Sequence, residues 1–446
     1  AFIPIYSEYI GTKDEKGRQD FLNALLGILL SALFIFTALA LLFAPMFILI
    51  FSPGFYFDDQ KQDLAVSLLR IMFPYLALIS LVAFAAGIQN SHNKFSIPAV
   101  TPLIFNLSLI GSAWLVAPKI EIPVMALAWG VLLAGFLQLL FQIAPLATIK
   151  KIPIPKIDIQ NPGVKKFFIL ILPAIVAGGI AQINLLIDTI FASLLITGSP
   201  TWLYVSDRLI QFPMGIFAIA IGTVLLPSLS KAYAQKEAQA FTEQLENAFK
   251  LIFFLAIPSL IGLILFASPL LATIFQRGAF LWGDVQQASL SLIGFSIGLP
   301  FFMAMKVLVP AFFSRQNTKT PMLIALLSLF INIFLNYLLA FYLELGHLGL
   351  AIASSISAIV SVFILSFILK KEGLITFAGI FSAFSFKVLI ASVALILFLT
   401  IFNQYFNFEL FTQAQRLMHL VVAVISSLII YFGVSFFLGI RPSDFK

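Results

Sequence analysis

Long apolar stretches recur along the whole chain, and each is near the length that a helix needs to cross a membrane. About 20 apolar residues in a helix span the hydrocarbon core of a bilayer. The alternating pattern of an outer-membrane β-barrel strand is absent, so these stretches are predicted to be helices. We expect twelve spans, at residues 21–51, 64–88, 97–117, 124–147, 167–196, 202–229, 251–267, 290–313, 322–342, 348–369, 386–402 and 417–438.

The composition indicates a polytopic membrane protein of the all-α class and excludes a soluble enzyme. Hydrophobic residues make up 61% of the 446 residues and charged residues only 10%, whereas roughly a quarter of the residues of a soluble domain are charged. Cysteine is absent, and His92, His347 and His419 show no metal-ligand spacing. We therefore expect no metal chemistry and interpret the three histidines as solvated or interfacial.

The net charge of +7 comes from the loops. Most of the 26 Lys and Arg residues lie in alternate loops, on one side of the predicted membrane, beginning with Lys13, Lys16 and Arg18. The positive-inside rule then places both termini in the cytoplasm. Lysines that flank spans meet the anionic headgroups of membrane lipids, and this explains the excess of positive charge without a nucleic-acid partner.

An internal repeat indicates two homologous lobes. The interval between Pro4 and Pro227, each in a Pro-x-x-Ser motif, equals the interval between Pro98 and Pro321, and each pair occupies the same place relative to a span. Repeated lobes of this kind are common in transporters. We predict a first lobe at 1–150, a cytoplasmic linker at 151–166, a second lobe at 167–371 and two extra C-terminal transmembrane helices at 372–446.

The same repeat predicts that the chain is truncated at its N-terminus. The second lobe has two spans before Pro227, whereas only three residues precede Pro4. We therefore expect about two helices upstream of residue 1, in a bundle of two pseudo-symmetric lobes plus two helices.

One cluster of polar residues lies within the predicted span 202–229. Ionisable groups in a span are costly unless they face a cavity or a partner, so each is a candidate functional residue. Arg208 and Gln211 are three residues apart and share a helix face beside Asp207, and a guanidinium can bind phosphate or carboxylate bidentately. With Thr201 these residues are candidates for substrate binding. The alternative is that Arg208 and Asp207 are satisfied by neighbouring helices.

A second set of polar residues falls in two other spans. Asp188 lies deep in 167–196, and Asn332 and Asn336 lie four residues apart on one helix face. Their oxygens could ligate a small hard cation such as Na⁺, or Asp188 alone could carry a proton. Interhelical hydrogen bonding is the alternative.

Two cations occupy corresponding places in the two lobes. The repeat places Arg70 and Lys306 in similar positions, where they could line a cationic cavity for substrate or snorkel to an interface. Lys387 lies near a span end and is interpreted as snorkelling.

Several segments resemble the MurJ/MviN family of lipid II flippases. The longest, at 209–230, reads LIQFPMGIFAIAIGTVLLPSLS. The other segments with this resemblance are 1–9, 93–98, 188–193 and 306–316, so that the likeness extends over the whole chain.

The resemblance implies a member of the multidrug/oligosaccharidyl-lipid/polysaccharide exporter (MOP) superfamily, with two six-helix lobes and two final helices beside a groove for a polyprenyl tail. Arg208 matches a cavity arginine of the family, and Gln211 stands where many members carry Glu. The family's other cavity arginines and an acidic partner belong to the two helices expected upstream. We therefore expect the headgroup site to be incomplete in this chain.

The function implied is that of a flippase, not an enzyme, in the bacterial inner membrane. It would carry undecaprenyl-pyrophosphate-linked peptidoglycan precursor from the inner to the outer leaflet by alternating access, a step of wall biogenesis and cell shape. The membrane potential, or Na⁺ or H⁺ at Asp188, would bias the cycle, and no cofactor is expected. The expected partners are lipid II and membrane lipids, with wall-synthesis proteins as further candidates.

Three other functions remain open at this point. A sibling exporter would move drugs or other lipid-linked oligosaccharides. A polytopic polyprenyl-linked glycosyltransferase would need an acidic residue on a sizeable outer loop, whereas Asp58, Asp59 and Asp63 lie in a short one. A membrane scaffold for wall assembly would transport nothing.

Overall fold

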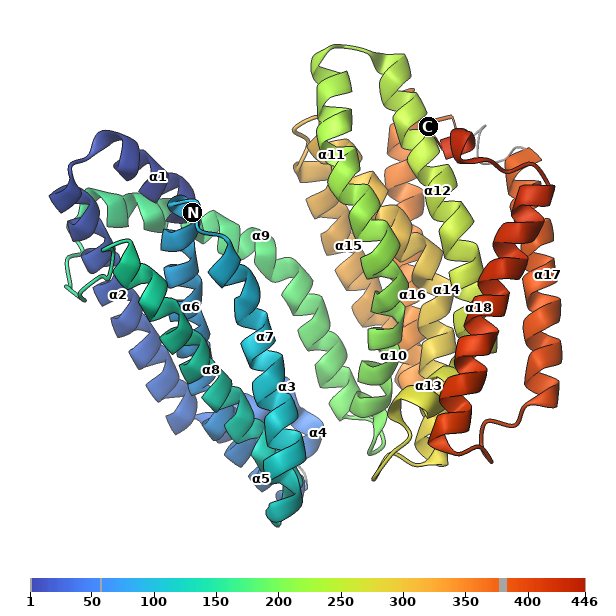
Figure 1. The fold of residues 1–446 in the computed structure, drawn as a ribbon, viewed down its shortest axis with the longest axis horizontal. Coiled ribbons are helices and arrows are strands. Elements are labelled where there is room, and N and C mark those ends of the chain that lie inside the picture. Colours follow the sequence, from blue (N-terminus) through green and yellow to red (C-terminus); the bar gives the residue numbers. More distant parts are fainter. Residues whose placement is uncertain (1, 57, 377–382, 446) are drawn as a thin grey trace. The chain divides into compact units, whose positions relative to one another are not determined.

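All regular structure in the described part of the chain is helical, as the sequence predicts (Figure 1). The computed structural model describes residues 2–56, 58–376 and 383–445, with the side chains of 172–174, 176–178 and 180–181 outside the description. The chain divides into two compact units, Ala1–Ile183 and Asn184–Lys446. The lobe boundaries expected from the repeat stay a prediction.

The first unit begins with a short helix packed on a long one. Tyr6 and Phe21 are fully buried, and the Tyr9 ring lies 4.7 Å from that of Phe21. Asp14 caps the long helix by accepting a hydrogen bond from Gly17 N–H at 2.9 Å. The helices of this unit are α1 (Phe2–Thr12), α2 (Glu15–Leu42), α3 (Ala44–Phe51), α4 (Pro53–Tyr56), α5 (Asp59–Met72), α6 (Pro74–Ser91), α7 (Ser96–Gly111), α8 (Pro123–Thr148) and most of α9 (Pro162–Ser193).

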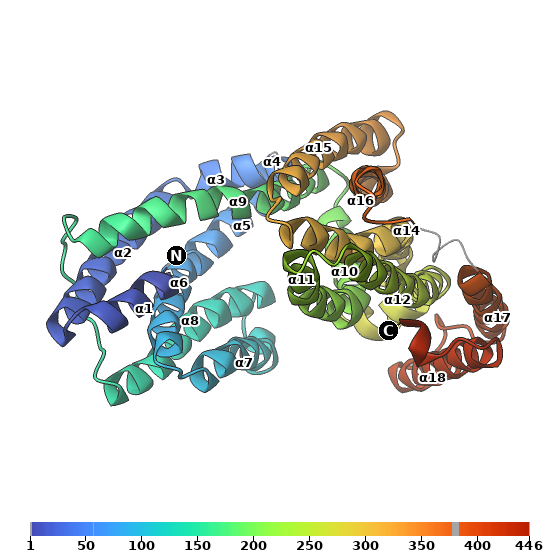
Figure 2. The same ribbon diagram turned by 90° about the horizontal axis from the view of Figure 1, so that it is seen from above.

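The second unit packs around one long, centrally buried helix. Leu292, Leu299 and Met303 of α14 (Trp282–Phe313) are fully buried against neighbouring helices. Figure 2 shows α17 and α18 side by side at the edge of this unit. The other helices are α10 (Ser199–Pro213), α11 (Ile219–Ala234), α12 (Ala238–Leu265), α13 (Ala267–Phe275), α15 (Lys319–Leu335), α16 (Gly346–Lys371), α17 (Ala383–Tyr405) and α18 (Gln413–Phe437).

The predicted spans correspond closely to the helices. Eleven helical segments in the described part of the chain are long and apolar enough to cross a membrane, and they correspond to eleven of the twelve predicted spans. The remaining predicted span, 167–196, corresponds to α9. The largest difference is at α12, which begins at Ala238 although its apolar stretch begins at 251. Phe241 and Leu245 of this extension are buried, so an amphipathic start lengthens the helix beyond its apolar core.

The interpretation of His347 as solvated or interfacial was wrong. Its side chain is buried, and its ring nitrogens lie 2.7 Å from Ser291 Oγ and 2.9 Å from Gln287 Oε1. Because each ring nitrogen has a hydrogen-bond partner on α14, the imidazole can be buried without an unsatisfied polar group. His92 and His419 are both half-buried, and His92 Nε2 lies 3.1 Å from the Tyr6 hydroxyl.

Candidate functional site

The candidate substrate-binding residues lie on one polar face of α10. Trp202, Val205 and Ile210 are buried on the packed side of this helix. Thr201, Tyr204, Arg208 and Gln211 are exposed and recur at helical spacing, so they form a continuous polar stripe. Residues Met214–Ala218 continue the helix as a π-helical segment after Pro213. Such segments are frequent at functional sites.

Within this stripe Arg208 is held by a ring and not by an acid. Its guanidinium carbon lies 4.7 Å from the centroid of the Tyr204 ring, a cation–π distance. Gln211 Nε2 donates instead to the neighbouring Asp207 carboxylate at 2.5 Å. Arg208 has no ion pair within the described residues. The guanidinium donors are therefore free to meet an anionic substrate.

The three residues expected to form a cation site are brought together by the fold. Asn336 Nδ2 donates to Asp188 Oδ1 at 2.8 Å and to Asn332 Oδ1 at 3.0 Å. Asn332 Nδ2 in turn donates to Ser354 Oγ at 3.3 Å. Asn332 and Asn336 are buried, and Asn336 begins another π-helical segment, Asn336–Tyr342. The fold thus brings these three side chains together, and a role in cation binding stays a prediction.

One oxygen of this cluster has no partner. Asn336 Oδ1 is buried and accepts no hydrogen bond from any described residue. Asp188, whose carboxylate accepts from Asn336, forms no ion pair within the described structure. An unsatisfied amide oxygen beside an unpaired carboxylate is an environment that favours a cation or a proton.

The remaining predicted site residues are not part of these clusters. Lys306 on α14 is exposed. Its backbone carbonyl oxygen lies close to Gly222, where α11 packs against α14. Arg70 belongs to the first unit, where its Nε lies 3.4 Å from the carbonyl oxygen of Leu41. A contribution of either residue to substrate binding stays a prediction.

Sequence reasoning missed a polar cluster that joins α10, α14 and α16. Trp202 Nε1 donates to Asp284 Oδ1 at 2.9 Å, and the Trp202 ring packs edge-on against His347 at 4.9 Å. Gln287 and Ser291 hold the two nitrogens of that histidine. The available signal was their spacing of four, which places both on one face of α14. The cluster fixes the start of the helix that carries Arg208.

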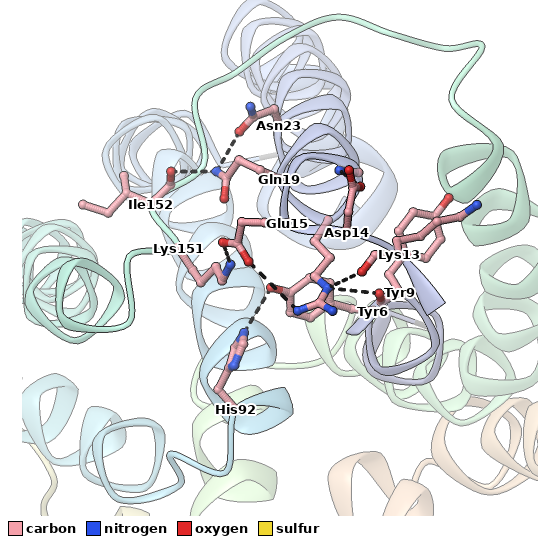
Figure 3. A network of polar contacts seen from close by, with 12 residues as sticks. Tyr6, Tyr9, Lys13, Asp14, Glu15, Gln19, Asn23, His92, Lys151 and Ile152 are labelled. Atoms are coloured by element: carbon pink, nitrogen blue, oxygen red, sulfur yellow. Dashed lines mark hydrogen bonds and ion pairs between the residues drawn. The ribbon is translucent and has the colours of Figure 1, made fainter. Parts of the chain in front are cut away.

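A second missed network lies in the first unit and ties the segment after α8 to α2 (Figure 3). The Lys151 ammonium pairs with the Glu15 carboxylate. Gln19 Nε2 donates to the Ile152 carbonyl at 2.9 Å, and Asn23 Oδ1 accepts from Ile154 N–H at 2.8 Å. These partners are over a hundred residues apart in the chain. Sequence spacing alone therefore gave no sign of the network.

Comparison with known proteins identifies first the class and then the family. An inward-facing multidrug resistance MATE family transporter of the MOP superfamily has the same fold, with a TM-score of 0.67 at 15% identity over 84% of each chain. A solved lipid II flippase MurJ in an inward closed conformation is more similar, with a TM-score of 0.78 at 27% identity over 96% of this chain and 86% of that one. The molecule is thus a polytopic membrane protein with the transporter fold of the MOP superfamily.

The sequence comparisons narrow this class to one family. The family model described as lipid II flippase MurJ matches residues 1–430. A relative from Haemophilus influenzae, named probable lipid II flippase MurJ, is 35% identical over 99% of this chain and 89% of its own length. The chain therefore belongs to the MurJ family of lipid II flippases, and the resemblance noted from its motifs is confirmed.

Proposed function

We propose that this chain moves lipid II, the polyprenyl-pyrophosphate-linked peptidoglycan precursor, from the inner to the outer leaflet of the bacterial inner membrane, with both termini in the cytoplasm. The observation that carries the proposal is the state of Arg208. This arginine lies on the polar face of a membrane helix with no acidic partner in the described structure. An arginine in a membrane helix is costly without a counter-ion, and the pyrophosphate of the substrate would supply one.

The α10 stripe would recognise the headgroup by its anionic and polar groups. Stacking on Tyr204 limits the rotation of the Arg208 side chain, so less conformational entropy is lost when it binds a phosphate. The Thr201 hydroxyl, on the same face, can donate to a sugar or phosphate oxygen. Gln211 and Asp207 are already paired with each other and add a polar surface with one net negative charge. Arg70 and Lys306 would add positive charge for the pyrophosphate.

No covalent chemistry is needed for this function. The substrate enters and leaves unchanged, so the protein has only to expose the headgroup site to each side in turn, the alternating access of transporters. We propose that the chain acts in this way, without a cofactor, in the membrane where wall-synthesis proteins are its candidate partners.

A cation at the Asp188 cluster would bias that cycle. The donor set fits a hard cation, since it offers one carboxylate and two amide oxygens. Asn336 now donates to Asp188 through its Nδ2 group. Rotation of this amide by 180° would turn its unpartnered Oδ1 toward Asp188, where it could serve as a ligand to the cation. When bound, Na⁺ would supply positive charge between the helices, and a proton on Asp188 would serve the same end. The membrane potential would act on either charge.

The test is flipping of fluorescent lipid II in vesicles that contain the purified chain. Arg208→Ala should lower the rate about 10- to 100-fold, because bonds to charged groups contribute about 1.5–3 kcal/mol. Arg208→Lys should recover only part of it, since an ammonium lacks the bidentate fork. Arg277→Ala, an exposed arginine that donates to the Ile274 carbonyl, is the matched control and should keep the rate. Flipping by Arg208→Ala at the rate of the unsubstituted chain would overturn the role of this residue.

A further inference from the structure

A small basic cavity lies in the second unit, away from the α10 stripe and the Asp188 cluster. Its volume is about 210 Å³, and it is lined by Lys250, Phe384, Lys387, Gly439, Ile440 and Asp444. These residues come from α12, from the start of α17 and from the segment that follows α18. Figure 1 shows this end of the chain beside α12. None of the residues proposed above for substrate or cation binding lines this cavity.

The cavity lies at the depth of the lipid headgroups. The apolar stretches predicted from the sequence begin at 251 in α12 and at 386 in α17, and the one in α18 ends at 438. Lys250, Lys387 and Gly439 therefore lie within two residues of three span ends, which the alternation of spans predicts to be on the same side of the membrane. Positive charges at this depth meet lipid phosphates.

The C-terminal segment builds one wall of the cavity. Gly439 adopts a left-handed conformation (φ +81°) that reverses the chain after α18. Ile440 is then buried, and the Phe445 ring packs 5.2 Å from Phe254 and 5.6 Å from Phe384. The ammonium of Lys387 lies 3.6 Å from the place of a Cβ on Gly439. The wall is thus fixed by packing.

Among the described residues, the positive charges of the cavity exceed the negative ones. Lys250 Nζ has a neutral partner, Asn247 Oδ1, at 3.3 Å. Neither Lys250 nor Lys387 forms an ion pair within the described residues. Asp444 Oδ2 instead accepts from Arg441 N–H at 2.8 Å. Two lysines against one aspartate leave a net positive lining, which favours an anion.

The surroundings point to a lipid as the source of that anion. Phe386, next to Lys387, is 67% exposed, and Phe437, two residues before Gly439, is 90% exposed. Arg441 stacks on Phe436 with its guanidinium carbon 3.9 Å from the ring centroid. Charge at the mouth and apolar surface beside it match an acidic headgroup with its acyl chains.

We propose that this cavity binds the phosphate of an acidic phospholipid between Lys250 and Lys387, with the acyl chains along α17 and α18. The lipid would hold the two C-terminal helices and the final segment of the chain to α12. The proposal does not depend on lipid II transport.

The test is a titration of the detergent-purified chain with phosphatidylglycerol, followed by native mass spectrometry. Lys250→Gln with Lys387→Gln should weaken binding about 10-fold or more. The matched control removes two exposed lysines from the end of α16, Lys370→Gln with Lys371→Gln, and should leave the affinity unchanged. An equal loss in both double variants would show general attraction to basic surface and would overturn the proposal, as would full affinity in the first.

Two further arms guard against misfolding and against another ligand. Asp444→Asn removes the negative charge of the lining and should strengthen phosphatidylglycerol binding several-fold, a gain that unfolding cannot produce. Weaker binding in this variant would contradict the proposal. Inorganic phosphate at millimolar concentration should not displace the lipid, because it lacks acyl chains. Displacement, or equal affinity for phosphatidylcholine, would show that the cavity does not select an acidic phospholipid.

Discussion

Asn336 donates one side-chain hydrogen bond to Asp188 and another to Asn332, and it keeps its own carbonyl oxygen unpartnered within the described structure. One amide thus links a carboxylate on α9 to the α15 helix, which lies over a hundred residues further along the chain. A cluster meant only to join helices would satisfy its buried oxygen. The open acceptor therefore favours a site that takes up a charge during the transport cycle.

Asp188→Asn tests this role directly. The substitution removes the negative charge and keeps the size of the side chain. The hydrogen bond from Asn336 to Asn332 should therefore survive, while the response of transport to a cation is lost. Flipping in vesicles should become independent of an imposed Na⁺ gradient or pH gradient. Asn184→Ala is the matched control, because Asn184 Nδ2 lies 3.5 Å from the same carboxylate and contributes little. A gradient response that survives in Asp188→Asn would exclude this carboxylate as the coupling group.

Most of the architecture was predictable because a membrane restricts the choices of a chain. Apolar stretches of sufficient length must become helices, and the boundary errors arise at amphipathic turns such as the start of α12. The cation cluster was also predictable in part, since Asn332 and Asn336 share a face at a spacing of four. Their pairing with Asp188 could only be proposed, because helix adjacency is set by tertiary packing.

The burial of His347 could not be predicted for a similar reason. Nothing near it in sequence shows that Ser291 and Gln287 will lie against its ring. The network around Lys151 was hidden in the same way, since its partners belong to α2. Long-range polar pairs depend on which helices become neighbours, and composition and periodicity do not determine this.

Gly222→Ala should destabilise the second unit. A Cβ at this position would approach the Lys306 carbonyl oxygen to 2.8 Å, so α11 and α14 would have to separate. Overpacking of this kind costs about 1–3 kcal/mol, which should lower the thermal unfolding midpoint in detergent by several degrees. Gly262→Ala on α12 is the control, because nothing lies within 4 Å of its Cβ position. Equal unfolding midpoints for the two variants would show that the close contact between α11 and α14 does not contribute to stability.

His347→Leu should also lower the unfolding midpoint. The substitution leaves the buried Ser291 and the half-buried Gln287 without their partner, and an unsatisfied buried group such as the Ser291 hydroxyl costs about 1–3 kcal/mol. Because the same histidine packs on Trp202, lipid II flipping should fall as well through the position of α10. His419→Leu is the control and should change neither quantity, because this half-buried histidine stacks on Phe411 and its ring nitrogen meets only the Gln415 carbonyl of its own helix among the described residues. A midpoint unaltered by His347→Leu would contradict a structural role for the cluster.

Acidification should weaken the first unit through His92. Burial, and secondarily the Lys151 charge, lower the pKa of this histidine below its ordinary value of 6.5. The unfolded chain therefore binds a proton more readily than the folded chain, and stability falls as the pH drops below about 6.5 until it passes the lower, folded pKa. Hydrogen exchange of the segment after α8, measured between pH 7.5 and pH 5 on a scale corrected for intrinsic rates, should show a loss of protection. His92→Gln, which keeps a polar partner for the Tyr6 hydroxyl, should flatten this pH response, and an equally steep response in the variant would assign the effect to other groups.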